Sequence, residues 1–317
     1  KCLNLHKRQF ITKQLADNVI ALFMPVTKTQ FLLPSTIQLL RFPFSFFLMP
    51  VYWFALSQVA EVKTLPAILV FIVLHLLVYP ASNGYNSYMD RDTESIGGVQ
   101  HPLQPTRQLL YATVLMDTAA ILISCFVSRY FALGIVLYIL VSKAYSYRGI
   151  RLKKYPFAGY ITVILFQGAF TFALVYYGCS ADKTLQIPVL ATIAASLLIG
   201  GFYPLTQIYQ HNADLKDGIK TMSYRLGYRG TFVYCGIIYT AAFLVLAFYF
   251  FYTLQITALY IFSLCMLPVI VYFLIWARKV WHNYIYADYR NTMRMNLIAS
   301  ICINIAFIII FIINRFE

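Results

Sequence analysis

Long apolar runs recur along this chain, and they constrain the fold more than any other feature of the sequence. A helix needs about 20 apolar residues to cross the hydrocarbon core of a bilayer. Nine runs of suitable length cover roughly residues 37–57, 66–88, 109–128, 130–147, 157–178, 187–210, 230–251, 255–277 and 294–314. Only 11% of the residues are charged, whereas soluble domains have about one quarter. The sequence therefore predicts an all-α integral membrane protein built as one helical bundle.

The distribution of Lys and Arg supports this count and predicts an orientation. If the N-terminus lies in the cytoplasm, 21 of the 25 Lys and Arg residues fall in segments on that side. This asymmetry is typical of the positive-inside rule. We therefore expect a multi-pass protein of the bacterial inner membrane with a cytoplasmic N-terminus. The basic residues are spread over short loops, so the formal net charge of +14 does not indicate nucleic acid as a partner.

The chain divides into a short leading segment and one long domain. Residues 1–36 are predicted to be a cytoplasmic N-terminal segment, either an extension or an amphipathic helix on the membrane surface from Leu5 to Phe23. Residues 37–317 would form the transmembrane domain. The six cysteines lie far apart and include no CxxC pair, which argues against a zinc site or a disulfide framework.

Two acidic clusters interrupt the apolar pattern, and each stands where an apolar run ends. In the first cluster, Asn86, Asp90 and Glu94 are four residues apart and would stack along one helix face. Asn83 would lie close to that face, whereas Asp92 would point elsewhere as a solvated charge. An amide oxygen and two carboxylates form a hard oxygen set of the kind that Mg²⁺ binds.

The second acidic cluster contains Asp214 and Asp217, which are three residues apart and would share a helix face. Carboxylates are costly in a membrane, so two clusters on the same side indicate a functional site. Together they could hold Mg²⁺ ions that bridge a diphosphate and help it to leave. His211 precedes Asp214 by one helical turn, and it could support the ligands, face the substrate or simply pack.

A basic loop lies on the same predicted side. It contains Arg148, Arg151 and Lys153, which could bind the remaining oxygens of a diphosphate. The same residues could instead only fix the topology of the loop. Arg41, at the start of the first span, could reach the substrate or could extend to the membrane interface.

These residues resemble the UbiA family of membrane prenyltransferases. The first family motif, written NDxxDRDxD, is matched by Asn86, Asp90, Arg91 and Asp92, with Ser87 in place of the Asp at its second position and Glu94 in place of its last Asp. The family loop YSxPPLxLK is matched by Tyr145, Ser146, Leu152 and Lys153. In the second motif Asp214 and Asp217 match, whereas Ala213 and Thr221 replace an Asn and an Asp.

The resemblance implies a bundle of nine helices around a central cavity. It also implies magnesium-dependent transfer of an isoprenyl group from an isoprenyl diphosphate to a lipophilic, commonly aromatic, acceptor, with diphosphate released on the cytoplasmic side. In that scheme the metal and diphosphate are bound by Asn86, Asp90, Glu94, Asp214 and Asp217. The phosphates are held by Lys153 with Arg148 or Arg151, and Tyr145 lies near them. The residues closest to the chemistry would be Asp90, Asp214 and Lys153, and substrate contacts would come from Arg41, Asn83 and His211.

Three other functions fit part of the pattern. A membrane carrier could use the carboxylates as coupling sites, although such charges usually lie near the middle of the bilayer. A catalytically altered family member could bind a polyprenyl lipid without turning it over. A CDP-alcohol phosphotransferase would need a DGxxAR motif, and the residues after Asp217-Gly218 do not match it.

Overall fold

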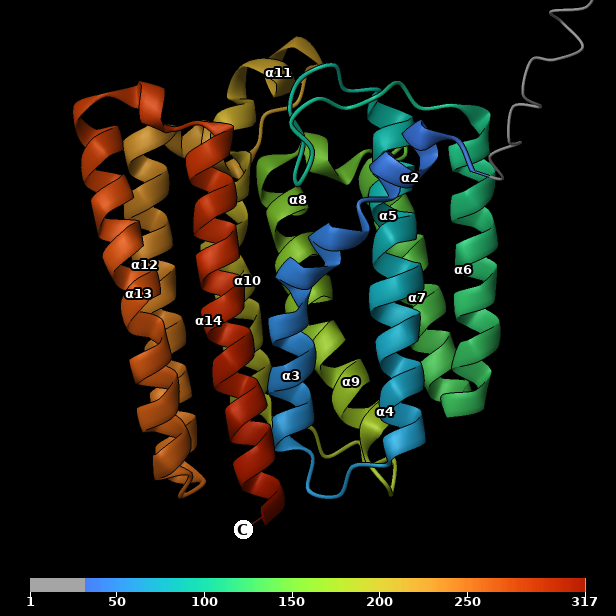
Figure 1. Ribbon diagram of the computed structural model, residues 1–317, viewed down its shortest axis with the longest axis vertical. Coiled ribbons are helices and arrows are strands. Elements are labelled where there is room, and N and C mark those ends of the chain that lie inside the picture. The colour runs from blue at the N-terminus through green and yellow to red at the C-terminus, as the bar shows by residue number, and fades with distance from the viewer. Residues whose placement is uncertain (1–31, 317) are drawn as a thin grey trace, which may run out of the picture. The chain divides into compact units, whose positions relative to one another are not determined.

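The structure, a computed structural model, describes residues 32–316, and these residues are mainly helical. The helices from Pro34 onward form one compact unit, and Figure 1 shows them running side by side. Within residues 32–316 the only β pairing is two isolated bridges. The surface helix predicted between Leu5 and Phe23 lies outside the described residues. The prediction of an all-α membrane bundle is confirmed.

Eight helical segments within residues 32–316 are long and apolar enough to cross a membrane. They are Pro34–Gln58, Thr64–Asp90, Arg107–Val127, Pro156–Cys179, Val189–Lys216, Met222–Tyr252, Ile256–His282 and Tyr289–Phe316. The remaining predicted span, 130–147, corresponds to α7, Arg129–Ser146, an 18-residue helix that packs on α6, Arg107–Val127. Each of the nine apolar runs therefore coincides with a helix.

The first two spans are each built from three consecutive pieces. The first contains α2 (Pro34–Leu40), the 3-10 helix η1 (Phe42–Leu48) and α3 (Met49–Gln58). The chain bends between α2 and η1 because Arg41 adopts a left-handed conformation, with φ 50°. The second contains α4 (Thr64–Phe71), the π-helix η2 (Ile72–Val78) and α5 (Tyr79–Asp90).

The fifth and sixth spans are also interrupted. The fifth comprises α8 (Pro156–Val163), the π-helix η4 (Ile164–Phe170) and α9 (Thr171–Cys179). The sixth comprises α10 (Val189–Gln207), the 3-10 helix η5 (Ile208–Gln210) and α11 (His211–Lys216). Pro204 lies inside α10, where it removes one backbone hydrogen bond to the preceding turn.

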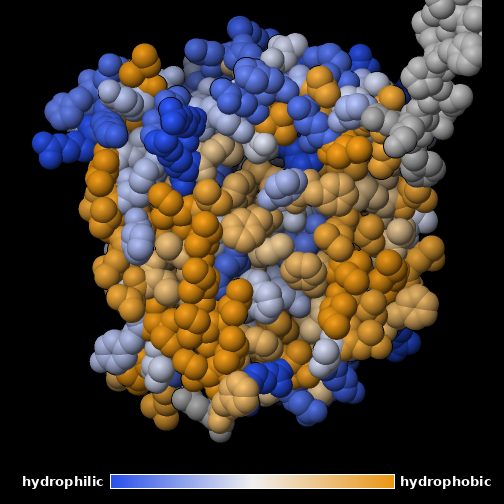
Figure 2. Space-filling model, viewed as in Figure 1, coloured by the Kyte–Doolittle hydropathy of each residue, from blue (hydrophilic) through white to orange (hydrophobic). Residues whose placement is uncertain are grey.

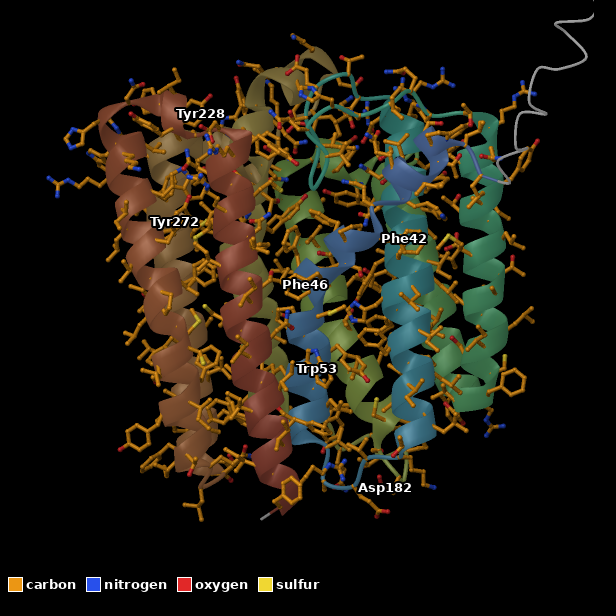
Figure 3. The ribbon with its side chains drawn as sticks, in the orientation of Figure 1. Phe42, Phe46, Trp53, Asp182, Tyr228 and Tyr272 are labelled. Atoms are coloured by element: carbon orange, nitrogen blue, oxygen red, sulfur yellow. The ribbon has the colours of Figure 1, made fainter. Side chains whose placement is uncertain are left out.

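The last three spans are long helices, and the first of them is kinked at Gly227, where φ is 68° and ψ is 176°. They are α12 (Met222–Tyr252), α13 (Ile256–His282) and α14 (Tyr289–Phe316), with short 3-10 turns elsewhere at η3 (Leu152–Lys154) and η6 (Tyr284–Tyr286). The side chain of Phe54 on α3 stacks on Phe307 of α14 with ring centroids 4.5 Å apart. Phe42, Phe46 and Trp53 follow one another down the first span in Figure 3.

The surface has the pattern of a membrane protein. Figure 2 shows hydrophobic side chains over the middle of the visible face and hydrophilic side chains at its two ends. In Figure 1 α2, α11 and the loop after α5 lie at one end of the bundle, and the C-terminal end lies at the other. We call the first of these the cavity end, because it holds the site described next.

Candidate active site

A cavity of about 210 Å³ opens at the cavity end, and its lining is mainly polar. Its residues come from five of the spans and from the loops that connect them. They include Arg41, Asn83, Asn86, Asp90, Asp92, Tyr145, Ser146, Lys153, Tyr203, Gln207, Gln210, Asp214 and Asp217. Both predicted acidic clusters therefore contribute to one cavity.

The end of α5 supplies the first wall. Asn86 accepts hydrogen bonds on its Oδ1 atom from Ser146 Oγ at 2.8 Å and from Lys153 Nζ at 3.1 Å. Lys153 also forms an ion pair with Asp90. The helix ends at Asp90, because Arg91 takes a left-handed conformation with φ 56° and ψ 42°. The Lys153 ammonium group is thus held between the amide and the carboxylate of the first cluster.

The early end of α5 changes which acids face the cavity. The prediction that Glu94 continues the helix face of Asn86 and Asp90 is wrong, because residue 94 lies beyond the helix. Glu94 does not line the cavity, and its carboxylate pairs on the surface with Lys216 at 2.6 Å. Asp92, predicted to be solvated, lines the cavity instead. Burial, reinforced by the nearby Asp90 carboxylate, raises the pKa of Asp92 to about 6.

The second cluster lies where α11 ends. Asp214 and Asp217 both line the cavity, as their three-residue spacing predicted. Gly218 follows with φ +70°, a conformation that glycine adopts without steric cost. The backbone N–H of Ile219 then donates back to the carbonyl of Asp214 at 2.8 Å, which closes the helix end. This local geometry fixes the two carboxylates relative to each other.

The basic loop connects the two acidic clusters. Arg151 Nη2 lies 3.3 Å from Asp90 Oδ1 and also forms an ion pair with Asp217. Arg148 behaves differently, because it donates to the backbone carbonyl of Met89 at 2.7 Å and does not line the cavity. The structure therefore brings Arg151 into contact with the acidic residues and places Arg148 on the outer end of α5.

Three further residues were predicted to contact the substrate. Arg41 is buried in the cavity wall, where it donates to the backbone carbonyls of Gly97 at 3.2 Å and Asn83 at 3.1 Å. Arg41 therefore does not extend to the interface. Asn83 also lines the cavity.

Of the three roles that the sequence allowed for His211, the structure favours simple packing. His211 is buried at the start of α11 and does not line the cavity. One ring nitrogen forms a hydrogen bond with Ser223 Oγ at 2.8 Å, and the ring stacks on Tyr228 with centroids 4.8 Å apart. Within the structure His211 is a packed residue.

A polar face that runs along α10 and η5 was not among the predicted site residues. Tyr203, Gln207 and Gln210 all line the cavity, and the Tyr203 hydroxyl forms a hydrogen bond with the hydroxyl of Tyr145. With Asp214 these residues are spaced by four, three and four positions, which is the repeat of one helix face. That spacing was a usable signal, but it lies at the end of a run that reads as an apolar span.

The donor atoms of the cavity suit Mg²⁺ chemically. Within residues 32–316 no three His, Cys, Asp or Glu side chains come close enough to share one ion. Mg²⁺ does not need such a cage, because one or two carboxylates with water and substrate phosphates commonly complete its shell. The amide oxygen of Asn86 and the carboxylates of Asp90, Asp92, Asp214 and Asp217 are hard donors of this kind.

Solved structures share this fold at low sequence identity. A UbiA homologue from Archaeoglobus fulgidus bound to DMAPP and Mg²⁺ is 17% identical, with a TM-score of 0.62 over 87% of this chain and 99% of that chain. A UbiA homologue from Aeropyrum pernix K1 is also 17% identical, with a TM-score of 0.62 over 84% and 97%. A digeranylgeranylglyceryl phosphate synthase is 16% identical, with a TM-score of 0.55 over 88% and 96%.

At the level of sequence, no curated protein matches the chain. The profile of one family, described as the UbiA prenyltransferase family, matches residues 47–298. This range includes both acidic clusters and the basic loop between them. Because the match covers well over half of the sequence, the chain belongs to the UbiA prenyltransferase family.

Proposed function

We propose that this protein transfers an isoprenyl group from an isoprenyl diphosphate to a lipophilic acceptor, for which an aromatic ring is the expected class. The main observation is that two acidic clusters, from α5 and α11, line one polar cavity and are joined by Arg151. The homologue from Archaeoglobus fulgidus binds DMAPP or GPP together with Mg²⁺. The distribution of Lys and Arg favours release of diphosphate on the cytoplasmic side of a bacterial inner membrane.

The acidic residues would bind the metal, and the basic residues would bind the phosphates. Asn86, Asp90 and Asp92 would act from the α5 side, and Asp214 and Asp217 from the α11 side, with Glu94 no longer in the set. Bound Mg²⁺ would neutralise the diphosphate and so make it a better leaving group. Its ligands are held in place by the end of α5 and by the closed end of α11.

Lys153 and Arg151 would hold the phosphate oxygens that the metal leaves free. Both already reach into the acidic clusters, where Lys153 pairs with Asp90. Guanidinium and ammonium groups form strong charge-assisted hydrogen bonds with phosphate. A diphosphate would therefore replace Asp90 and Asp217 as the partner of these two cations.

The isoprenyl chain would extend from the cavity toward the bundle interior. Tyr145 and Tyr203 form part of the cavity wall, and their rings could stabilise an allylic cation by cation–π contact. Phe202, next to Tyr203 on α10, and Leu198, about one turn further along the helix, line an apolar pocket that also includes Phe54. This order of a polar head site followed by apolar walls suits an isoprenyl diphosphate.

The test is diphosphate release by the purified, detergent-solubilised protein. Geranyl, farnesyl or geranylgeranyl diphosphate would be supplied with Mg²⁺ and then with EDTA, with a lipid extract as acceptor source. Asp90→Ala and Asp214→Ala should abolish the release. Glu61→Ala is the matched control, because Glu61 is exposed in the loop between α3 and α4, which lies at the opposite end of the bundle (Figure 1).

The outcomes separate the proposal from its alternatives. Magnesium-dependent release that both variants lose supports a prenyltransferase. Donor binding without release in any extract would favour a member that binds polyprenyl lipid without turnover. If the protein shows neither release nor magnesium-dependent donor binding, the proposal is wrong and a membrane carrier becomes the better explanation.

A further inference from the structure

A second cavity lies beside the first, on the outer side of α14. It has a volume of about 460 Å³ and is lined by Gln100, Tyr289, Arg290, Met293, Arg294 and Leu297. We call it the arginine groove. Two pairs of its residues, Arg290 with Arg294 and Met293 with Leu297, are each four positions apart on one helix. The groove therefore has a cationic edge beside an apolar edge, and both run along the helix axis.

The two arginines keep their charges available. Both side chains are exposed, and neither forms an ion pair with a carboxylate in the described part of the chain. The nearest acid in the sequence is Asp288, which caps α14 by accepting hydrogen bonds from the backbone N–H of Asn291 at 2.7 Å and its side-chain amide at 3.1 Å. Arg294 also lies beside the hydroxyl group of Tyr272, which is labelled in Figure 3.

The groove is separated from the catalytic cavity by a thin wall of aromatic side chains. Tyr289 lines the groove, and its ring meets the ring of Tyr209 edge to face with centroids 5.4 Å apart. Arg41, in the cavity wall, lies near both tyrosines. The Tyr209 hydroxyl is buried without a hydrogen-bond partner. A molecule in the groove would thus lie next to the cavity without entering it.

We infer that the arginine groove binds the anionic headgroup of a bilayer phospholipid, with an acyl chain along Met293 and Leu297. Guanidinium groups bind phosphate oxygens in pairs, and two of them one helical turn apart can hold one headgroup. The neighbouring apolar edge suits a hydrocarbon chain better than a water-soluble anion. This inference is independent of the proposed reaction, because none of the groove residues is needed to bind the metal or the diphosphate.

The test measures lipid binding directly. Native mass spectrometry of the full, detergent-solubilised protein would count bound phosphatidylglycerol and, in parallel, phosphatidylcholine. Each basic residue near an anionic headgroup contributes about five-fold in affinity, so Arg290→Gln with Arg294→Gln should weaken phosphatidylglycerol binding about twenty-five-fold. The matched control is Arg278→Gln with Lys279→Gln, which removes two exposed cations near the C-terminal end of α13. The control should change the affinity less than about two-fold, because these two cations do not line the groove.

Three results would overturn the inference. The first is equal loss of phosphatidylglycerol binding in the groove variant and the control variant, or no loss in either. The second is equal binding of phosphatidylcholine, which would show that headgroup charge is not recognised. The third is displacement of the lipid by an equal concentration of inorganic phosphate, which would assign the groove to a free anion. Magnesium-dependent donor binding, measured in the same samples, should stay unchanged and reports separately on the catalytic site.

Discussion

Separate substitution of two neighbouring acids, Asp92 and Glu94, gives the sharpest test of the catalytic site. We expect Asp92→Asn to remove most magnesium-dependent diphosphate release, whereas Glu94→Gln leaves it nearly intact. The reason is geometric, because Asp92 lines the cavity and Glu94 pairs with Lys216 at the surface. Sequence spacing alone predicts the opposite result. Both substitutions remove one negative charge and keep the size of the side chain.

The expected magnitudes differ by about two orders. Removing one preorganised electrostatic group from an active site typically lowers turnover about 10²- to 10³-fold, or about 3–4 kcal/mol. Asp92 faces the cavity, so we expect its loss to fall in that range. The pair between Glu94 and Lys216 is largely exposed, and such pairs contribute about 0–1 kcal/mol. Loss of Glu94 should therefore change the rate by no more than about five-fold.

The assay is release of diphosphate at saturating donor over a series of Mg²⁺ concentrations. Size-exclusion chromatography and a thermal unfolding curve of each variant would confirm that folding is unchanged. A response at Glu94 as large as that at Asp92 would refute the reasoning, because it would mean that residue 94 turns into the cavity in the active state. Equal tolerance of both substitutions would also refute it, since Asp92 would then have no part in the site.

Three further predictions follow from contacts in the bundle. Arg151→Gln should weaken donor binding about 10- to 100-fold at constant Mg²⁺, the effect of one charge-assisted hydrogen bond, and a donor titration checks this. Gly168→Ala should lower the unfolding free energy by about 1–3 kcal/mol, because the added methyl group would lie 2.6 Å from the backbone of α10, whereas Gly230→Ala should be neutral or slightly stabilising. Ser223→Ala should cost about 1–3 kcal/mol by leaving His211 without its buried partner, and a thermal melt should show this with donor affinity unchanged.

The helices could be predicted from the sequence because membrane spanning imposes one simple requirement. A run of apolar residues that is long enough to cross the bilayer must satisfy its backbone within a helix. Each run therefore marks a span wherever its side chains pack. The run at 187–210, for example, contains Gly200, Gly201 and Pro204 and is still helical, because neighbouring helices support the backbone around these residues.

The positions of the site residues depended on local backbone choices that spacing does not reveal. Arg41, Arg91 and Arg151 all adopt left-handed conformations, which are uncommon for residues other than glycine. At Arg91 this conformation ends α5. As a result Asp92 lines the cavity and Glu94 lies at the surface, the reverse of what the spacing predicts. Because arginine gives no signal of such a turn in sequence, spacing alone predicts that the helix continues to Glu94.

The composition of the cavity provides a physical reason for the metal. Its carboxylates outnumber the cations that contact or line it: the acids are Asp90, Asp92, Asp214 and Asp217, and the cations are Arg41, Arg151 and Lys153. A free diphosphate would be repelled by this excess of negative charge, whereas a divalent cation would be attracted. The bundle tolerates these four carboxylates in largely apolar surroundings because Arg151 and Lys153 neutralise part of their charge. Donor binding should therefore require the metal as well as the basic loop, and neither alone should suffice.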